Sequence, residues 1–242
     1  MPMRIVTWNC NGAFRRKFHA LDQFDADILI IQECEDPAQS KSKDYMSWST
    51  DYFWTGDSKN KGLGVFLKKG VYGQLLDWPP VFEGKEVKHF LPFLINGDFQ
   101  LVGVWTHQNN SPTFGYIGQL WKYIQLHQNK LDKGFVTGDF NSNAIWDRKN
   151  RWWNHTDVVH QLAAKGIKSA YHLKYNEESG EESIPTFYLQ KNLNKPYHID
   201  YIFCPEEYHN RITNFEIGTV ATWLPHSDHM PLFLELSSDA LS

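Results

Sequence analysis

The stretch Phe135-Val136-Thr137-Gly138-Asp139-Phe140-Asn141 joins a short apolar run to a polar turn. The apolar part reads as a buried strand, and the polar residues stand where that strand ends. Side chains two residues apart in an extended chain share a face, so Asp139 and Asn141 are predicted to project together while Phe140 points into the core. A strand end holds such groups rigidly, as a catalytic site requires.

Four further polar islands adjoin strand-like apolar runs in the same way. They are Trp8-Asn9-Cys10-Asn11-Gly12, Gln32-Glu33, His198-Ile199-Asp200 and Ser227-Asp228-His229. The same alternation predicts that Asn9 and Asn11 share one face, and that His198 and Asp200 share another. Carboxylate, amide and imidazole groups at several strand ends suit a metal-assisted attack on phosphate, and the set is far more informative than any one island.

Four carboxylates would lie near one point if the islands converge: Glu33, Asp139, Asp200 and Asp228. Unneutralised, they would repel one another and any phosphate, although each acid taken alone would more often be a solvated strand end. A hard divalent cation removes the repulsion, and oxygen ligands without cysteine favour Mg²⁺ or Mn²⁺ over zinc. His229 is predicted to pair with Asp200, which would fix the tautomer of its imidazole.

The length and patterning of the chain predict one α/β domain over residues 1–242. With 41% hydrophobic residues and no linker-like segment, the chain can bury a large core. Asn96-Gly97 predicts a tight hairpin between strands at 89–95 and 99–105, and a second hairpin is predicted from 62–68 and 71–76. Helices are predicted over about 13–24, from Ser111-Pro112 onward, and from a cap at Thr156 to a stop at Gly166.

Many strands with a few interspersed helices favour two packed sheets with helices on the outer faces. A doubly wound parallel sheet is the alternative, but the Asn-Gly hairpin and the weak strand-helix-strand rhythm in the middle of the chain argue against it.

Charge and cysteine usage restrict the cellular context. A net charge of −4 gives no global basic field of the kind that non-specific nucleic-acid binders carry, although a local basic surface is compatible with it. Three cysteines in apolar runs, with no zinc-like spacing, predict buried thiols in a reducing compartment. The first strand begins almost at Met1 and no apolar stretch could span a membrane, so a cytoplasmic location is expected, with no membrane association and no obligate protein partner.

The islands, in this order, resemble the exonuclease III/deoxyribonuclease I-like superfamily, also called the endonuclease/exonuclease/phosphatase family. The resemblance runs from Trp8-Asn9 to Ser227-Asp228-His229, nearly the whole chain, and Lys61-Gly62-Leu63-Gly64-Val65 adds a weaker match. It implies a four-layered α/β sandwich of two mixed β-sheets with helices outside. It also implies divalent-metal-dependent cleavage of phosphodiester or phosphomonoester bonds.

Carried over residue by residue, the resemblance implies a metal site for Mg²⁺ or Mn²⁺. Glu33 would bind the metal, with Asn9 and Asp228 nearby. If two cations act, Asp139 and Asn141 would also be ligands.

The resemblance also implies the catalytic roles. Asp139 would orient or deprotonate the attacking water, and Asn141 would hold the phosphate or Asp139 itself. His229, paired with Asp200, would bind the phosphate and stabilise its developing charge. His107 looks like the second histidine of the deoxyribonuclease and phosphodiesterase branches, and could stabilise the leaving oxygen.

One segment departs from the pattern of the abasic-site endonucleases in this family. They carry a Tyr-x-Pro-Asn-like segment, where this chain reads Trp105-Thr106-His107-Gln108-Asn109-Asn110. The departure argues against abasic-site repair and leaves phosphoester hydrolysis untouched.

A loop that interleaves three cations with three tryptophans follows the central island: Trp146-Asp147-Arg148-Lys149-Asn150-Arg151-Trp152-Trp153. Such a loop could grip phosphates and stack on exposed bases. The alternative is that the tryptophans pack on the sheet rim while the charges face water. The residues expected at a nucleic acid are Asn11, Arg148, Lys149, Arg151 and Trp152.

The sequence therefore predicts a metal-dependent hydrolase of phosphodiester bonds, with nucleic acid as its partner: a nuclease acting on DNA, or also on RNA. A phosphatase or phosphodiesterase of small phosphate esters is the alternative within the same chemistry. A catalytically silent nucleic-acid-binding module is the third reading, and the intact set of islands argues against it.

Overall fold

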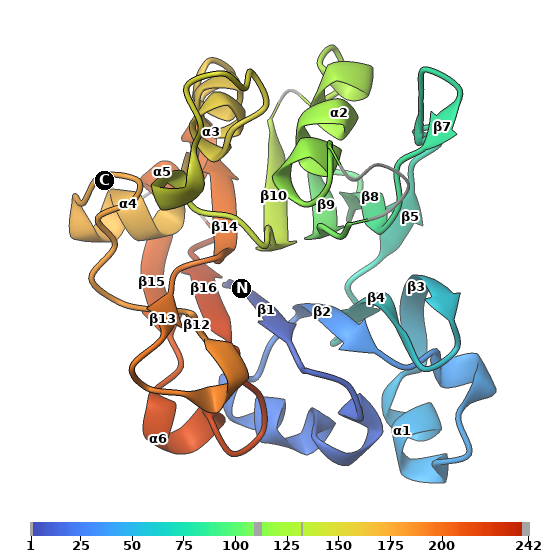
Figure 1. Ribbon diagram of the computed structural model, residues 1–242. Helices are drawn as coiled ribbons and strands as arrows, with labels where there is room; N and C mark the ends of the chain where they lie inside the picture. The colour runs from blue at the N-terminus through green and yellow to red at the C-terminus, as the bar shows by residue number, and fades with distance from the viewer. Residues whose placement is uncertain (1, 109–112, 132, 239–242) are drawn as a thin grey trace.

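Two six-stranded mixed sheets pack face to face in the computed structural model, which describes residues 2–108, 113–131 and 133–238 (Figure 1). The first sheet has the order β15 (Ile212–Ile217), β16 (Leu232–Leu236), β1 (Met3–Asn9), β2 (Ile28–Cys34), β4 (Lys61–Leu67) and β3 (Asp51–Ser58). Its β1 and β2 run parallel, and its other neighbouring strands run antiparallel.

The second sheet is built on the same plan around another parallel pair, β9 and β10. Its order is β11 (Ile167–Ser169), β14 (Asp200–Pro205), β10 (Gly134–Asp139), β9 (Phe99–Trp105), β8 (Phe90–Ile95) and β5 (Gly73–Leu75). Two small ribbons complete the strands: β6 (Val81–Phe82) with β7 (Lys85–Glu86), and β12 (Phe187–Tyr188) with β13 (Pro196–Tyr197).

Successive side chains of the apolar strands point to opposite faces of the sheet, so they pack into the cores on both sides of it. Ile28 and Ile30 of β2 belong to the core between the two sheets, together with Phe135 of β10. Leu29 and Ile31 point the other way, into a second core beneath the outer segments. Both faces of these central strands are thus buried, which is why they read as continuous apolar runs rather than alternating ones.

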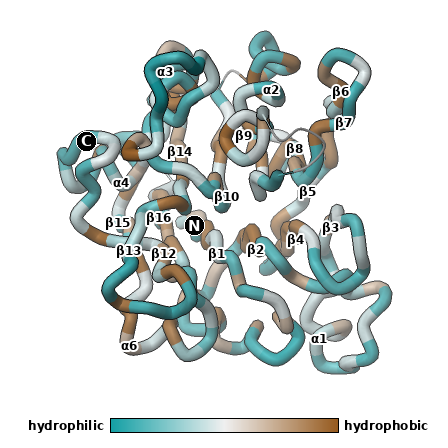
Figure 2. The backbone as a smooth tube through the Cα atoms, in the orientation of Figure 1, coloured by the Kyte–Doolittle hydropathy of each residue, from teal (hydrophilic) through white to brown (hydrophobic). Residues whose placement is uncertain are grey.

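Helical segments form the two outer layers, so the predicted four-layered sandwich is confirmed. The α-helices are α1 (Lys43–Trp48), α2 (Ile117–His127), α3 (His155–Ala163), α4 (Ala170–Tyr175), α5 (Glu206–His209) and α6 (Val220–Trp223). Among the described residues, five 3₁₀ segments accompany them: η1 (Phe14–Arg16), η2 (Phe18–Phe24), η3 (Pro37–Gln39), η4 (Ala144–Trp146) and η5 (Leu189–Lys191). Figure 1 shows α2 and α3 over the second sheet, with α1, α6 and the first 3₁₀ segments over the first. Figure 2 shows hydrophobic residues along the strands and hydrophilic ones in the surrounding loops.

The prediction of one continuous amphipathic helix over residues 13–24 is wrong. The segment forms two 3₁₀ pieces, because Ala13 has a left-handed φ of 52° and Lys17 has non-helical φ and ψ angles. Competing side-chain bonds explain the break: the Lys17 ammonium donates to the Cys10 carbonyl, and the backbone N–H of Arg15 donates to Glu35. Phe14, Phe18 and Leu21, which recur at helical spacing, are nevertheless all buried.

The hairpin predicted from 62–68 and 71–76 is also wrong. β4 pairs with β2 and β3 in the first sheet, whereas β5 pairs with β8 in the second. The turn at Lys69-Gly70, where both residues have positive φ, carries the chain from one sheet to the other. The hairpin at Asn96-Gly97 is confirmed: β8 and β9 pair with Ile95 opposite Phe99.

Two predicted helix starts shift along the chain. α2 begins at Ile117, while Ser111-Pro112 lies outside the described residues. α3 begins at His155, because Asn154 rather than Thr156 caps it through a reciprocal capping box with Asp157.

Two further features bear on the expected context. Cys10, Cys34 and Cys204 are buried free thiols, as predicted. Within the described ranges, no helix combines the length and apolar character needed to cross a bilayer.

Candidate active site

The strand ends of both sheets meet at one edge of the sandwich. The parallel strands β1 and β2 end there with Asn9 opposite Gln32, and β10 meets β14 with Asp139 opposite Asp200. A hydrogen bond joins the two sheets at this edge, because the Asn9 side-chain amide donates to the Asp139 carboxylate at 2.9 Å. Residues from distant parts of the chain therefore share one buried centre.

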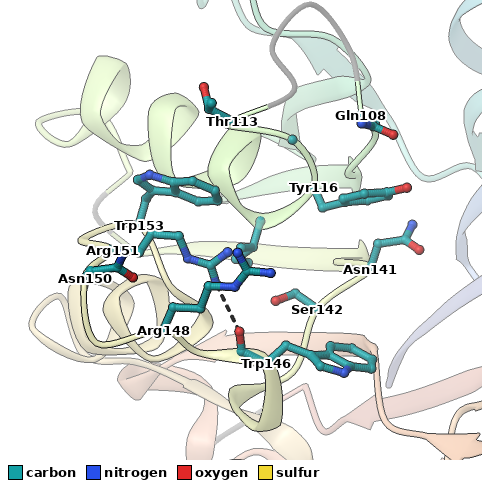
Figure 3. Close-up of a pocket in the computed structure, with 12 residues that line it drawn as sticks. Gln108, Thr113, Tyr116, Asn141, Ser142, Trp146, Arg148, Asn150, Arg151 and Trp153 are labelled. Atoms are coloured by element: carbon teal, nitrogen blue, oxygen red, sulfur yellow. Dashed lines mark hydrogen bonds between the residues drawn. The ribbon is translucent and has the colours of Figure 1, made fainter.

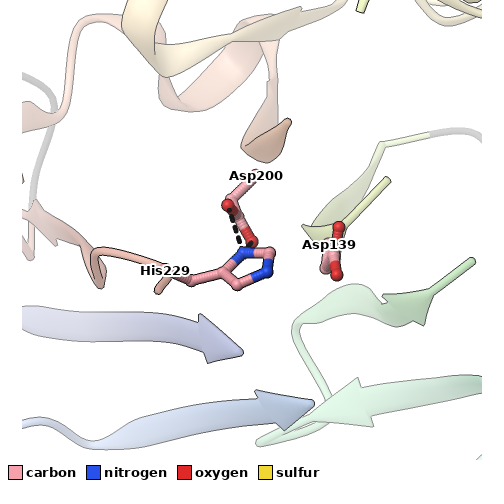
Figure 4. Close-up of side chains that lie close together, drawn as sticks. All are labelled: Asp139, Asp200 and His229. Atoms are coloured by element: carbon pink, nitrogen blue, oxygen red, sulfur yellow. Dashed lines mark hydrogen bonds and ion pairs between the residues drawn. The ribbon is translucent and has the colours of Figure 1, made fainter. Parts of the chain in front are cut away.

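His229 precedes β16 and is fixed on both its backbone and its ring. Its N–H donates to the Ser227 hydroxyl at 3.0 Å, and its carbonyl accepts from the Trp8 indole at 2.9 Å. Its Nδ1 is hydrogen-bonded to both carboxylate oxygens of Asp200, at 2.9 and 3.1 Å. Figure 4 shows the other ring nitrogen turned toward Asp139. The bond to Asp200 thus leaves one imidazole nitrogen for a ligand.

Asp200 is itself held by a residue that the sequence did not single out. The Thr186 hydroxyl donates to the Asp200 carboxylate at 2.7 Å and accepts from the backbone N–H groups of Ile199 and Asp200. Thr186 lies just before the two-residue strand β12, and no pattern in the local sequence marks it. It fixes the carboxylate that orients His229.

Asp139 accepts three hydrogen bonds at the end of β10. Besides Asn9, the backbone N–H of Asn141 donates at 2.8 Å and its side-chain amide at 2.9 Å. Asn141 can reach back because its φ is positive, at 45°, where the chain turns out of the strand. The alternation argument thus placed the right two residues together, although a turn rather than extended chain joins them.

Burial and charge shift the ionisation of this cluster. Burial raises the pKa of Asp139 above its usual range, and the nearby Asp200 carboxylate raises it further. Burial lowers the pKa of His229, but the attraction and hydrogen bond of Asp200 outweigh it, with help from Asp139, so the net pKa is raised. The arrangement favours a fixed imidazolium beside a carboxylate that binds a proton more readily than an exposed one.

The predicted metal residues Glu33 and Asp228 lie on the rim rather than within this cluster. Glu33 sits at a β-bulge between β2 and β4 with a φ of 63°, and its carboxylate forms an ion pair with Lys61 at 2.9 Å. Bulges re-aim side chains, and a non-glycine residue in the left-handed region is often functional. The half-buried Asp228 adjoins His229, and its backbone carbonyl accepts from Tyr188.

One group of metal-capable side chains forms the buried centre. Asp139, Asp200 and His229 offer ligand atoms that all lie within 4.8 Å of one another. The structure therefore brings together three of the predicted catalytic residues.

His107 and Asn11 are exposed residues that each follow a strand ending at this edge. His107 is exposed and lies two residues beyond Trp105, which is the residue opposite Asp139 in β9. Asn11 is exposed, and its backbone N–H donates to the Asn9 side chain at 3.0 Å.

The prediction that His198 and Asp200 project together is wrong. His198 lies before β14, its Nδ1 is hydrogen-bonded to the Ile184 carbonyl at 2.8 Å, and its ring packs 4.4 Å from that of Tyr171. Strand alternation does not apply, because β14 starts only at Asp200. His198 supports the fold outside the cluster of Asp139, Asp200 and His229.

A cavity of about 540 Å³ opens beside Asn141 (Figure 3). Its lining includes the predicted Arg148 and Arg151, but neither Lys149 nor the exposed Trp152. It also includes three aromatic residues absent from the predicted set: Tyr116, Trp146 and Trp153. Trp146 and Trp153 could be suspected from the basic-aromatic loop, whereas nothing in the sequence marks Tyr116.

Comparisons with known proteins agree with the two-sheet α/β sandwich. The Endonuclease/Exonuclease/phosphatase family matches residues 6–229, and the chain belongs to that family. A comparison with curated proteins finds no match.

Solved structures share the fold at low sequence identity. The 3′ phosphatase NExo from Neisseria, bound to a product DNA hairpin, is 18% identical with a TM-score of 0.68, covering 97% of this chain and 99% of that one. An AP endonuclease from Archaeoglobus fulgidus is 19% identical with a TM-score of 0.66, covering 97% and 99%. The AP endonuclease LMAP from Leishmania major is 12% identical with a TM-score of 0.68, covering 98% and 88%.

Proposed function

We propose that this protein is a divalent-metal-dependent phosphodiesterase that acts as a nuclease on DNA, and also on RNA where the strand is accessible. The observation that carries the proposal is the buried cluster of Asp139, Asp200 and His229 at the strand ends. A protein that only bound nucleic acid would gain nothing from an oriented imidazolium beside a buried carboxylate. The family membership and the DNA-bound relative of the same fold support this substrate class.

The residues present fit a hard divalent cation. Glu33 is held at its bulge with its carboxylate against the Lys61 ammonium, a positive charge that stands where a cation could bind. The Lys61 side chain is 51% exposed and can be displaced into water. We assign Glu33, Asn9 and Asp228 to Mg²⁺ or Mn²⁺, with the carboxylates of the buried cluster available to a second ion. Bound there, the ion would neutralise the charge of the phosphate.

The protein side chains supply the remaining steps. Asp139, with its raised pKa and fixed by Asn9 and Asn141, accepts a proton from the attacking water. His229 presents its free ring nitrogen to the phosphate and stabilises the charge that develops there. Asp200 keeps that imidazole charged and in place. We assign His107, an exposed residue two positions beyond the end of β9, to the leaving oxygen.

The test is a metal-supplemented hydrolysis assay. The protein, with Mg²⁺, with Mn²⁺ and with EDTA, is incubated with single-stranded DNA, duplex DNA, RNA and small phosphate esters. We expect metal-dependent cleavage of polynucleotides, reduced by roughly two or more orders of magnitude in Asp139→Asn and in His229→Ala.

Two outcomes would contradict the proposal. Cleavage of small esters with none of polynucleotides would select a small-ester phosphatase. Equal rates in the wild type and in Asp139→Asn would show that any observed cleavage does not come from this site.

A further inference from the structure

The cavity beside the catalytic centre has the composition of a nucleobase site. Asn141 and Ser142 form its inner end, so it begins where the Asp139 carboxylate is held. Figure 3 shows the Tyr116 ring on one side and the Trp146 ring on the other, with Asn141 and Ser142 between them. The cavity is therefore a slot between two aromatic residues that leads away from the reacting phosphate.

Both aromatic rings are exposed enough to accept a stacked ligand. Tyr116 is 44% exposed and Trp146 is 43% exposed, although each lines a concave site. Trp146 leans against Tyr197, with 5.1 Å between ring centroids, so one face of its indole is already supported. Aromatic side chains of this kind stack on unpaired bases irrespective of base identity.

The slot is held in place before any ligand binds. The side-chain oxygen of Asn154 accepts from the backbone N–H of Arg148 and from Nε of Arg151, and Arg151 also donates to the Trp146 carbonyl at 3.2 Å. On the opposite wall, Tyr116 has a φ of 54° and its N–H donates to the His107 carbonyl. Strain retained in a bulky residue at a site edge is typical of ligand clamps.

The two arginines that line the slot differ in their contacts. The Arg151 guanidinium lies 4.3 Å above the Trp153 ring and is committed to the loop. Arg148 is exposed and points into the cavity beside it (Figure 3). A guanidinium in that position suits the phosphate of a neighbouring nucleotide.

We propose that the slot between Tyr116 and Trp146 binds one unpaired nucleobase of a polynucleotide, with Arg148 on a phosphate of the same strand. This inference rests on the proposed function and adds a substrate class to it. A cavity of about 540 Å³ accommodates a nucleotide but not a base pair within a stacked duplex. The enzyme therefore acts on single strands or frayed ends, where no base has to be unpaired and unstacked first.

The experiment is a double-mutant cycle in which one change removes a base from the substrate and the other removes an aromatic ring from the slot. The cleaved bond is first mapped in a single-stranded dT 12-mer, and a second 12-mer then carries a tetrahydrofuran residue, which has no base, at the nucleotide next to that bond. We expect kcat/KM to fall at least tenfold on loss of the base, about 1.4 kcal/mol. We expect Trp146→Ala and Tyr116→Ala to cause a similar loss on the normal 12-mer and little further loss on the tetrahydrofuran 12-mer.

Three controls separate this role from a structural one. Trp146→Phe and Tyr116→Phe keep a ring and should retain most of the wild-type rate. Tyr72→Ala removes a more exposed aromatic residue, 65% exposed, at the far edge of the second sheet beside β5, and should change nothing. A blunt hairpin duplex should be cleaved at least tenfold more slowly than the 12-mer.

The outcomes distinguish this inference from the proposed function. If the wild type cleaves none of these substrates with Mg²⁺ or Mn²⁺, the proposed function fails. If it cleaves duplex as fast as the single strand, or if the slot variants lose as much rate on the tetrahydrofuran 12-mer, the inference fails while the function stands. Inhibition by thymidine monophosphate as strong as by an uncleaved 12-mer would also overturn it, because the slot would then serve free nucleotides.

Discussion

Substituting Gly138 with alanine should damage both the stability and the activity of this protein. Gly138 is the residue of β10 directly before Asp139, it lies opposite Val104 of the parallel strand β9, and its φ is +145°. A Cβ atom built on it would stand 1.8 Å from the Val104 carbonyl oxygen and 3.1 Å from the Gln32 side-chain nitrogen. The strand that carries the Asp139 carboxylate therefore has no room for a methyl group at Gly138.

The expected cost follows from this geometry. A real Cβ stays beyond 3.0 Å from backbone atoms, so β9 and β10 must separate by more than an ångström in the middle of the sheet. Overpacking of a core costs about 1–3 kcal/mol, and a left-handed φ on a residue with a side chain costs about 1–3 kcal/mol more. We expect Gly138→Ala to lower the free energy of unfolding by about 2–6 kcal/mol. Because Asp139 moves with the strand, we also expect roughly a hundredfold loss of turnover.

The assay is urea denaturation followed by tryptophan fluorescence, with DNA cleavage measured in parallel. Gly134→Ala is the matched control, since Gly134 begins the same strand and a Cβ there would meet Gln100 at an ordinary 3.4 Å. We expect the control to change the free energy of unfolding by less than about 1 kcal/mol in either direction. If Gly138→Ala were as stable and as active as Gly134→Ala, the close approach of β9 and β10 would be refuted.

Three further predictions concern separate parts of the molecule. Glu33→Ala should raise the Mg²⁺ concentration for half-maximal rate by about tenfold or more, because it removes a proposed metal ligand; a metal titration that leaves this midpoint unchanged removes Glu33 from the site. Burial lowers the pKa of His155 to about 4, so its folded pKa lies below the unfolded value of about 6.5. The stability it contributes is complete above about pH 6.5 and is lost as the pH falls toward 4, by roughly 2 kcal/mol at pH 4.5. Unfolding curves at pH 7 and 4.5 should therefore show a smaller acid loss in His155→Leu than in the wild type, and equal losses would contradict the assignment. Arg148→Ala should weaken DNA binding for all sequences alike and reduce the slope of log K against log salt by about 1, which binding titrations at several salt concentrations measure.

Local sequence signals predicted the parts of the fold that are decided locally. Asn96 and Gly97 both adopt positive φ, as the tight turn between β8 and β9 requires, and their dipeptide predicted it. Lys69-Gly70 has the same local character, yet the strands on either side belong to different sheets. Which sheet a strand joins depends on contacts far away in the sequence, so no pattern near residue 70 could reveal it.

In the candidate site, too, local sequence marks some residues, whereas others are defined only by contacts with distant parts of the chain. Asp139, Asn141 and Asp200 were predicted because each stands beside an apolar run that forms a strand. Thr186 was missed because its role exists only once the chain before β12 lies against β14. Tyr116 was missed for a similar reason: the cavity that it lines is completed by Trp146 from another loop. Patterns along the chain mark residues that lie on regular elements, and they do not mark partners supplied by irregular segments.

The first sheet has an order that matters during synthesis. Its central strand β1 hydrogen-bonds on one side to β16, with Met3 opposite Leu236, although everything in the second sheet is made between them. A nascent chain on the ribosome can finish the second sheet but must leave one flank of β1 open until β16 has emerged. His229 lies just before that last strand, so under the proposed function the nascent chain gains its catalytic histidine only after every strand of the second sheet has been made.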